Sequence, residues 1–183
     1  MRIKNNNYYY KNLTVKKCNN GLGLFAKKNF KRGEIILEFI GKIVHRSEID
    51  KVKNEKTKKL IDDYSIQIDK DIFLLGTGQD KKIYDDFINH SCDPNAYVFI
   101  NGNKVLLIAL KNIKKNEEIT YDYSTTMYND SWSIKCHCGS KKCRGYIKEF
   151  KYLPSKIKMK YYHLGILPSY IVDIFFKRRT KKG

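Results

Sequence analysis

The stretch Phe87-Ile88-Asn89-His90-Ser91-Cys92-Asp93-Pro94-Asn95 is the most informative part of this chain. Its polar, turn-forming residues follow an apolar lead-in at 84–88 and precede an apolar run at 97–100 that is typical of a strand. The simplest interpretation is a surface turn, which Pro94 and the neighbouring Asp and Asn residues favour. The alternative is a functional site, because Asn and His orient donors and acceptors and Cys92 offers a thiolate.

A cysteine cluster later in the chain favours the functional site. Three of the five cysteines follow the pattern C-x-C-x4-C: Cys136, Cys138 and Cys143. Two cysteines one residue apart are poor disulfide partners, but they suit two corners of a tetrahedral zinc site, which takes four nitrogen or sulfur ligands. The fourth ligand is open at this point between the adjacent His137 and the more distant Cys92 or Cys18.

Together these motifs resemble a known family. The run 89–95, then Glu118-Ile119-Thr120-Tyr121-Asp122-Tyr123, then the cysteine pattern ending in Arg144-Gly145, is similar to a SET-domain protein lysine methyltransferase with a post-SET zinc loop. Gly21-Leu22-Gly23-Leu24-Phe25 resembles the opening G-x-G turn of that family, and 64–69 lies where relatives carry a strand that begins with Tyr. The resemblance covers residues 13 to 147, in the order of the family.

The resemblance implies a fold as well as a set of boundaries. It predicts a mainly β fold, the SET-domain β-clip, in which segments 87–95 and 119–124 thread past one another in a pseudoknot, with short helices and a C-terminal helical appendage. The implied division is an N-terminal extension (1–12), the SET domain (13–126), the post-SET zinc loop (127–150) and a basic C-terminal helical segment (151–183).

Local patterns predict the individual elements without help from the family. Strands are expected at 13–18 and 24–26, extended chain at 34–44 with a break at Gly41, and hairpins at 64–75 and 97–110, the second turning at an Asn-Gly step. Segment 46–63 is charged, and its apolar residues are too sparse to predict a helix. Helices are expected at 155–164 and 169–176, each following a proline.

The activity that the resemblance implies is methyl transfer from S-adenosylmethionine to a lysine ε-amine, with mono- or dimethylation as the product. The implied catalytic residues are Tyr123, Tyr121 and Tyr64. Tyr123 corresponds to the tyrosine whose hydroxyl lies near the transferring methyl, and Tyr64 to a wall of the lysine channel. A second hydroxyl on Tyr121 would occupy space that a more methylated lysine needs.

The resemblance also implies a cofactor site and a metal site. The implied cofactor-binding residues are Gly21, Leu22, Gly23, Leu24, Asn89, His90 and Trp132. The implied zinc ligands are Cys92, Cys136, Cys138 and Cys143, which leaves Cys18 outside the site. For His90 a structural, buried role is an equally weighted interpretation, and Trp132 would either cover the adenine or anchor the zinc loop.

Composition restricts the cellular setting and the partners. The chain of 183 residues carries a net charge of +18, and residues 141–183 hold thirteen Lys and Arg against two acidic residues. This basic segment is a candidate nucleic-acid contact, although an A/T-rich genome would enrich lysine equally well. Neither a run of eighteen apolar residues nor a signal peptide is evident, so we expect an intracellular protein without a membrane span, in the nucleus or on chromatin if eukaryotic and otherwise cytoplasmic.

The expected partner is a lysine-containing protein or peptide, with histones among the candidates. A second hypothesis is a catalytically weak SET-like module that binds histone tails or nucleic acid, and Tyr123 and the G-x-G turn argue against it. A third, a small zinc protein that binds nucleic acid, leaves Tyr121-Asp122-Tyr123 unexplained. One departure from the family is Asp86, where many relatives carry an arginine that helps to bind the cofactor. Asp86 cannot make the same contact with the cofactor.

Overall fold

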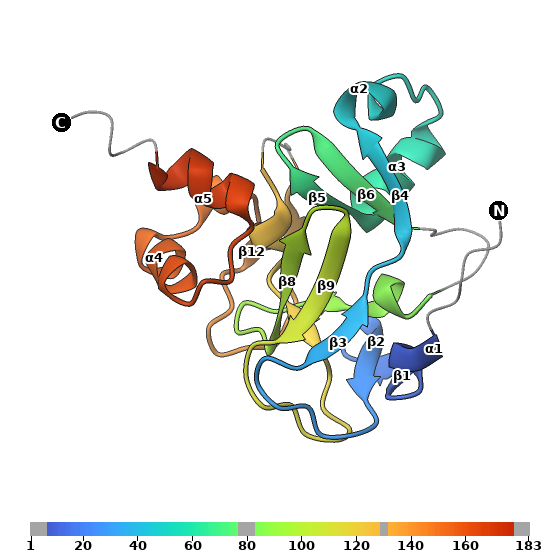
Figure 1. The fold of residues 1–183 in the computed structure, drawn as a ribbon, viewed down its shortest axis with the longest axis vertical. Coiled ribbons are helices and arrows are strands. Elements are labelled where there is room, and N and C mark those ends of the chain that lie inside the picture. The colour runs from blue at the N-terminus through green and yellow to red at the C-terminus, as the bar shows by residue number, and fades with distance from the viewer. Residues whose placement is uncertain (1–6, 77–82, 129–131, 178–183) are drawn as a thin grey trace.

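The fold is taken from a computed structural model that describes residues 7–76, 83–128 and 132–177. Short strands dominate this part of the chain (Figure 1). One antiparallel sheet has the order β3-β9-β8, formed by Ile35–Glu38, Lys104–Ala109 and Ala96–Asn101. A second has the order β4-β6-β5, formed by Gly41–His45, Ile72–Gly76 and Ser65–Asp69. The prediction of a mainly β fold is confirmed.

Three strand pairs complete the β structure of the described residues. The N-terminal hairpin joins β1 (Leu13–Cys18) to β2 (Gly21–Ala26), and the cysteine-rich segment forms β11 (Ile134–Lys135) with β12 (Tyr146–Ile147). The third pair is parallel and joins β7 (Asn89–His90) to β10 (Thr120–Tyr121). The two motif segments that the sequence predicts to cross therefore lie side by side, while their threading as a pseudoknot stays a prediction.

Asn95 fixes this parallel pair through its side chain. Its amide nitrogen donates to the carbonyl oxygen of Glu118 at 2.7 Å, and its amide oxygen accepts from the backbone N–H of Thr120 at 2.9 Å. The side chain is 4% exposed, so each of these polar atoms needs a protein partner in place of water. The asparagine at the end of the motif thus holds β10 against the loop that carries Cys92.

The helices are short and lie outside the sheets. They are α1 (Asn7–Tyr10), α2 (Arg46–Ile49), α3 (Glu55–Tyr64), α4 (Ser155–His163) and α5 (Ser169–Phe175), with 3-10 turns η1 (Tyr84–Phe87), η2 (Tyr123–Thr126) and η3 (Phe150–Tyr152). Pro154 and Pro168 precede α4 and α5, as predicted. Two expectations are corrected: segment 46–63 does contain helices, and β5 begins at Ser65, so Tyr64 ends α3 and does not start a strand.

Buried side chains form one main core and a satellite under the C-terminal helices. The main core joins the N-terminal hairpin to β3, β8 and β9 through residues such as Leu24, Leu37 and Leu107, all fully buried. The satellite lies between α4, α5 and the edge of the β3-β9-β8 sheet (Figure 1) and contains Phe150, Tyr161 and Ile171. The expected C-terminal appendage is therefore packed onto the domain.

Candidate active site and metal centre

A cavity of about 300 Å³ lies where β5, β6, η1 and β10 meet. Two groups of side chains in its lining matter for chemistry. We call Tyr121 and Tyr123 the tyrosine wall. We call the four acidic residues of the lining the carboxylate wall: Asp62, Asp63, Asp85 and Asp86.

The tyrosine wall brings together two predicted catalytic residues. The ring centroids of Tyr121 and Tyr123 lie 4.8 Å apart, and the Tyr123 hydroxyl donates to the carbonyl oxygen of Ile88 at 2.6 Å. Burial raises the pKa of both phenols well above the ordinary value. Both tyrosines therefore remain neutral at physiological pH, and neither can serve as a general base.

Tyr64 and Trp132 lie at the borders of the same cavity. Tyr64 is 43% exposed and is close enough for its phenol to raise the pKa of Tyr123 further. Trp132 is partly buried, lines the cavity and also packs against Cys92, Cys136 and Ile147. Trp132 thus links the cavity to the cysteine cluster, as either of its two predicted roles requires.

Asn89 lines the cavity, whereas the predicted glycine segment does not. The amide nitrogen of Asn89 donates to the carbonyl oxygen of Leu22 at 3.0 Å and to Glu118 Oε1 at 2.8 Å. Residues 21–24 belong to β2 and contact the cavity only through this amide. A Cβ atom on Gly23 would lie 2.4 Å from Glu118 Oε1 and 3.0 Å from Asn89 Nδ2, so a larger residue here would force these side chains to shift.

The deeper part of the carboxylate wall, Asp85 and Asp86, is partly buried. Burial raises the pKa of Asp85 to about 7, the backbone N–H of Ile40 lowers it, and the neighbouring Asp86 raises it. Asp85 Oδ2 accepts from Ile40 N–H at 3.0 Å, but the buried Oδ1 has no hydrogen-bond partner among the described residues. A cation in the cavity would stabilise the ionised form of Asp85.

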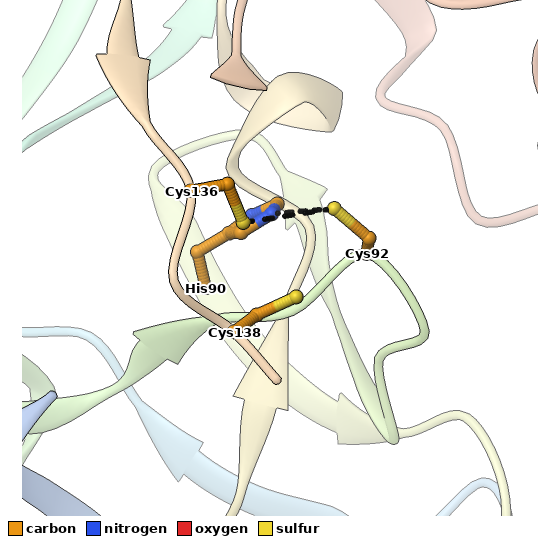
Figure 2. A group of neighbouring side chains, drawn as sticks. All are labelled: His90, Cys92, Cys136 and Cys138. Atoms are coloured by element: carbon orange, nitrogen blue, oxygen red, sulfur yellow. Dashed lines mark hydrogen bonds between the residues drawn. The ribbon is translucent and has the colours of Figure 1, made fainter. Parts of the chain in front are cut away.

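Four side chains of types that bind metals converge next to Tyr123, and Figure 2 shows how they face one another. The ligand atoms of His90, Cys92, Cys136 and Cys138 all lie within 4.8 Å of one another, and three of the four residues are buried. Cys92 comes from the loop after β7, and Cys136 and Cys138 come from the segment after β11. The structure therefore brings together three of the four predicted zinc ligands from positions far apart in the sequence.

The spacing of these sulfur atoms fits a tetrahedral zinc ion. Cys92 Sγ and Cys136 Sγ lie 3.8 Å apart, and a tetrahedron with Zn–S bonds of about 2.3 Å has edges of about 3.8 Å. Burial raises the pKa of Cys92 to about 11. Burial also raises the pKa of Cys138, but backbone and thiol hydrogen bonds outweigh it and lower that pKa to about 7. A cation would stabilise all of these thiolates.

His90 and Cys143 compete for the fourth position. Cys143 is exposed, yet its thiol hydrogen-bonds Cys136 and Cys138. His90 Nδ1 accepts the backbone N–H of Tyr123 at 3.2 Å, and His90 Nε2 lies 3.3 Å from Cys92 Sγ. Burial lowers the pKa of His90 to about 4, so the ring is neutral. With Nδ1 as an acceptor, the neutral ring carries its proton on Nε2, which faces Cys92 Sγ; Nδ1 also lies 3.5 Å from Asp122 Oδ1.

Asp122 is a buried residue at the site to which the sequence analysis assigns no role. Its side chain is almost fully buried, and one oxygen accepts from Arg144 Nη2 at 2.8 Å. The other oxygen accepts from the Tyr161 hydroxyl at 2.8 Å. Its position between the two motif tyrosines was visible in the sequence, but its partners come from the zinc loop and from α4, which no local pattern connects.

Residues 21–124 match the sequence profile of the SET domain. The chain belongs to the SET-domain family. This match covers more than half of the chain and contains both motif segments, while the cysteine cluster of the post-SET region follows directly after it. The SET domain here has a β-rich fold, and the cysteine cluster is consistent with a post-SET zinc loop.

Curated relatives of this SET domain carry names of chromatin enzymes. Histone-lysine N-methyltransferase trithorax of Drosophila virilis is 35% identical over 131 residues, which is 69% of this chain and 3% of the relative. A variant-silencing SET domain-containing protein of Plasmodium falciparum is 35% identical over 149 residues, 75% of this chain and 6% of the relative. An H3 lysine-4 specific histone-lysine N-methyltransferase of Schizosaccharomyces pombe is 36% identical over 131 residues, 69% and 14% respectively. The chain thus spans only a small part of these relatives.

Proposed function

We propose that this SET domain is a protein-lysine N-methyltransferase that uses S-adenosylmethionine. The observation that carries the proposal is the tyrosine wall, in which two neutral phenols line a cavity beside the family motif. An uncharged, buried wall suits the reaction because the attacking amine must itself be neutral, against an ordinary lysine pKa of about 10.4. The names of the relatives support the same activity.

In this proposal the chain positions reactants and supplies no base. Tyr123 donates its own proton to the carbonyl oxygen of Ile88, so its oxygen lone pair is free to accept an N–H of the lysine amine and to aim the nitrogen. Burial of the site lowers the pKa of the bound amine, which releases its proton to water before transfer. Positioning of this kind contributes several of the roughly 7–11 kcal/mol available to well-oriented reactants.

The cofactor would supply the methyl group as a sulfonium, and the C–S bond breaks as the new N–C bond forms. Asn89, His90 and Trp132 are the residues that we propose for its binding, together with the backbone of 21–24. Asn89 and Trp132 line the cavity, which supports their role. Both ring nitrogens of His90 are engaged by Tyr123 and Cys92, so His90 would contribute through its backbone. The segment 21–24 is linked to the cavity by the Asn89 amide, so its contribution is the weaker part of the assignment.

We further propose one zinc ion held by Cys92, Cys136, Cys138 and Cys143. The Nδ1 atom of His90 is occupied by the Tyr123 N–H, so the imidazole presents a proton and no lone pair to the cluster. His90 would then donate an N–H···S hydrogen bond to the Cys92 thiolate. The zinc would fix the segment that carries Trp132, which lines the cavity.

The carboxylate wall supports a cationic substrate, and we propose a lysine with basic neighbours, of the kind found in histone tails. Asp62 and Asp63 are exposed at the end of α3, while Asp85 and Asp86 lie deeper. Exposed carboxylates attract a basic peptide, since opposite charges raise both the rate of encounter and its specificity. A chromatin location follows if the substrate is a histone.

A methyl-transfer assay tests the function directly. Radiolabelled S-adenosylmethionine is incubated with the chain and with histones, or with total cell extract, in parallel with the Tyr123→Phe variant. We expect label on lysine in the wild-type reaction and almost none in the variant reaction. Label that is absent from both reactions, in spite of measurable cofactor binding by calorimetry, would favour the binding-module hypothesis.

A nucleic-acid contact through the basic segment is a second proposal, and one observation favours it. Lys148 lies over the rings of both Tyr146 and Tyr152, which are 54% and 62% exposed. Exposed aromatic rings beside lysines are typical of surfaces that stack bases and neutralise phosphates. Binding of a labelled oligonucleotide should weaken with salt, and the double change Tyr146→Ala and Tyr152→Ala should weaken it at constant salt.

The described residues contain no helix that is long and apolar enough to cross a membrane.

A further inference from the structure

The C-terminal helices reach the centre of the site through two buried tyrosine hydroxyls. Tyr161, on α4, is 1% exposed and donates to Asp122 Oδ2 at 2.8 Å. Tyr170, on α5, is 5% exposed and donates to the carbonyl oxygen of Gln67 at 3.2 Å. Both helices lie beyond residue 124, where the family match ends.

Asp122 collects donors from three separate segments. Ser124 N–H, in the following turn, and Arg144 Nη2, from the zinc loop, both bind Oδ1, at 3.1 and 2.8 Å. Tyr161 binds Oδ2. The carboxylate is 2% exposed, and a buried charge is stabilised only when all of its lone pairs find partners. Without the Tyr161 hydroxyl, Oδ2 would lose the one hydrogen bond found for it among the described residues.

Arg144 transmits the position of Asp122 to the cysteine cluster. Its side chain pairs with Asp122, and its backbone N–H donates to Cys92 Sγ at 3.4 Å. Nη1 of Arg144 is buried and has no hydrogen-bond partner among the described residues, whereas Nη2 donates to Asp122 Oδ1 at 2.8 Å and to Ser124 Oγ at 3.3 Å. A shift of the Asp122 carboxylate would therefore move the zinc loop at the residue next to Cys143.

We propose that Tyr161 is a positioning residue, which acts through Asp122 to hold Arg144 and the zinc loop against the SET domain. The C-terminal helical segment is then part of the site and not an appendage. The inference rests on the zinc ligand set proposed above, but it does not depend on methyl transfer. Burial and the Asp122 carboxylate both raise the pKa of Tyr161, which keeps the hydroxyl a donor at neutral pH.

Metal release tests this role, with a matched control from the same helical segment. The full chain and its Tyr161→Phe and Tyr170→Phe variants are loaded with zinc, and release to a chromophoric chelator is followed. Each variant removes one buried hydroxyl, but only Tyr161 contacts Asp122. We expect Tyr161→Phe to release zinc about tenfold faster, the size of one hydrogen bond to a charged group, and Tyr170→Phe to stay within about twofold of wild type.

A double-mutant cycle with Arg144→Lys separates positioning from general loosening of the fold. Lysine keeps the charge but loses the planar fork, so the Tyr161→Phe change should add little to the release rate in that background. Equal acceleration by Tyr161→Phe and Tyr170→Phe, additive effects in the cycle, or a wild-type chain that holds no zinc would each overturn the inference. A chain that holds zinc as expected but transfers no methyl group would refute the proposed activity and leave this inference intact.

Discussion

The two walls of the cavity differ in how completely their polar atoms are satisfied. In the tyrosine wall, the Tyr123 hydroxyl and backbone N–H both have partners, Ile88 and His90. In the carboxylate wall, Asp85 keeps a buried oxygen without a hydrogen bond among the described residues, and its pKa is raised to about 7. The tyrosine wall is fixed by hydrogen bonds within the protein, whereas the Asp85 carboxylate can still form a hydrogen bond or ion pair with a ligand.

This difference separates positioning from attraction. A satisfied, neutral wall can hold a nitrogen in line with a methyl group, because its own atoms have no reason to move. An unsatisfied carboxylate gains most when a cation arrives, since the ligand supplies the missing partner. Changes in the tyrosine wall should therefore alter turnover, and changes in the carboxylate wall should alter stability and charge preference.

The largest effect is expected from Tyr123→Phe. The change deletes the hydroxyl that orients the amine but almost no volume, so turnover should fall about 10²- to 10³-fold while cofactor affinity stays constant. Steady-state kinetics and calorimetry measure the two quantities, and Tyr8→Phe, on an exposed ring, is the control. Full activity of Tyr123→Phe would show that the tyrosine wall does not position the lysine amine.

Removal of one proposed zinc ligand behind the tyrosine wall should have the next largest effect. Cys143→Ser should weaken metal affinity about 10²-fold and more than His90→Gln, which removes only a donor to Cys92 and should cost about tenfold. Cobalt substitution distinguishes the ligands, because the sulfur-to-metal absorption scales with the number of thiolates. A wild-type absorption that corresponds to three thiolates and is unchanged in Cys143→Ser would identify His90 as the ligand.

The carboxylate wall predicts an unusual pH dependence of stability. The pKa of Asp85 is raised on folding, from 3.8 to about 7. Proton binding to Asp85 therefore contributes to the free energy of unfolding in full below about pH 4, and this contribution is lost as pH rises through 7. Asp85→Asn should stabilise the fold by about 2 kcal/mol at pH 8, after allowance for partial exposure, and by nothing at pH 4.

Denaturant unfolding of both proteins at the two pH values measures this difference. Asp63→Asn, at an exposed position of the same wall, is the control and should leave the pH dependence unchanged. An equal gain in the free energy of unfolding from Asp85→Asn at both pH values would show that Asp85 is ionised throughout this range. The proposed difference between the two walls would then not hold for Asp85.

The smallest effect is expected from Tyr121→Phe. Loss of this hydroxyl vacates space beside the amine, so turnover should change by no more than a few-fold while the product moves from one methyl towards two or three. Mass spectrometry of a lysine peptide after reaction measures the methylation state. An unchanged product distribution would contradict the interpretation of Tyr121 as a limit on channel volume.

Local sequence determined much of the secondary structure. The Asn101-Gly102 step forms the predicted hairpin turn, with Gly102 at a φ of 57°, because a residue without Cβ adopts that conformation at no steric cost. Helix α3 was missed because its apolar residues are few among many charged ones, and none of its residues is buried. Its signal was Asn54, whose side chain accepts from Thr57 N–H at 3.0 Å as an N-cap.

Family motifs predicted the site residues, and the tertiary structure determines which of these side chains contact one another. The spacing C-x-C-x4-C predicted a metal site from the sequence alone, since cysteines one residue apart are poor disulfide partners but suit two corners of a tetrahedral site. The orientation of His90 could not be predicted, because it depends on the backbone N–H of Tyr123 across the parallel β7-β10 pair. Likewise, the Asp122 contacts with Arg144 and Tyr161 join residues 22 and 39 positions apart. Such contacts follow from packing of whole elements, which no local pattern records.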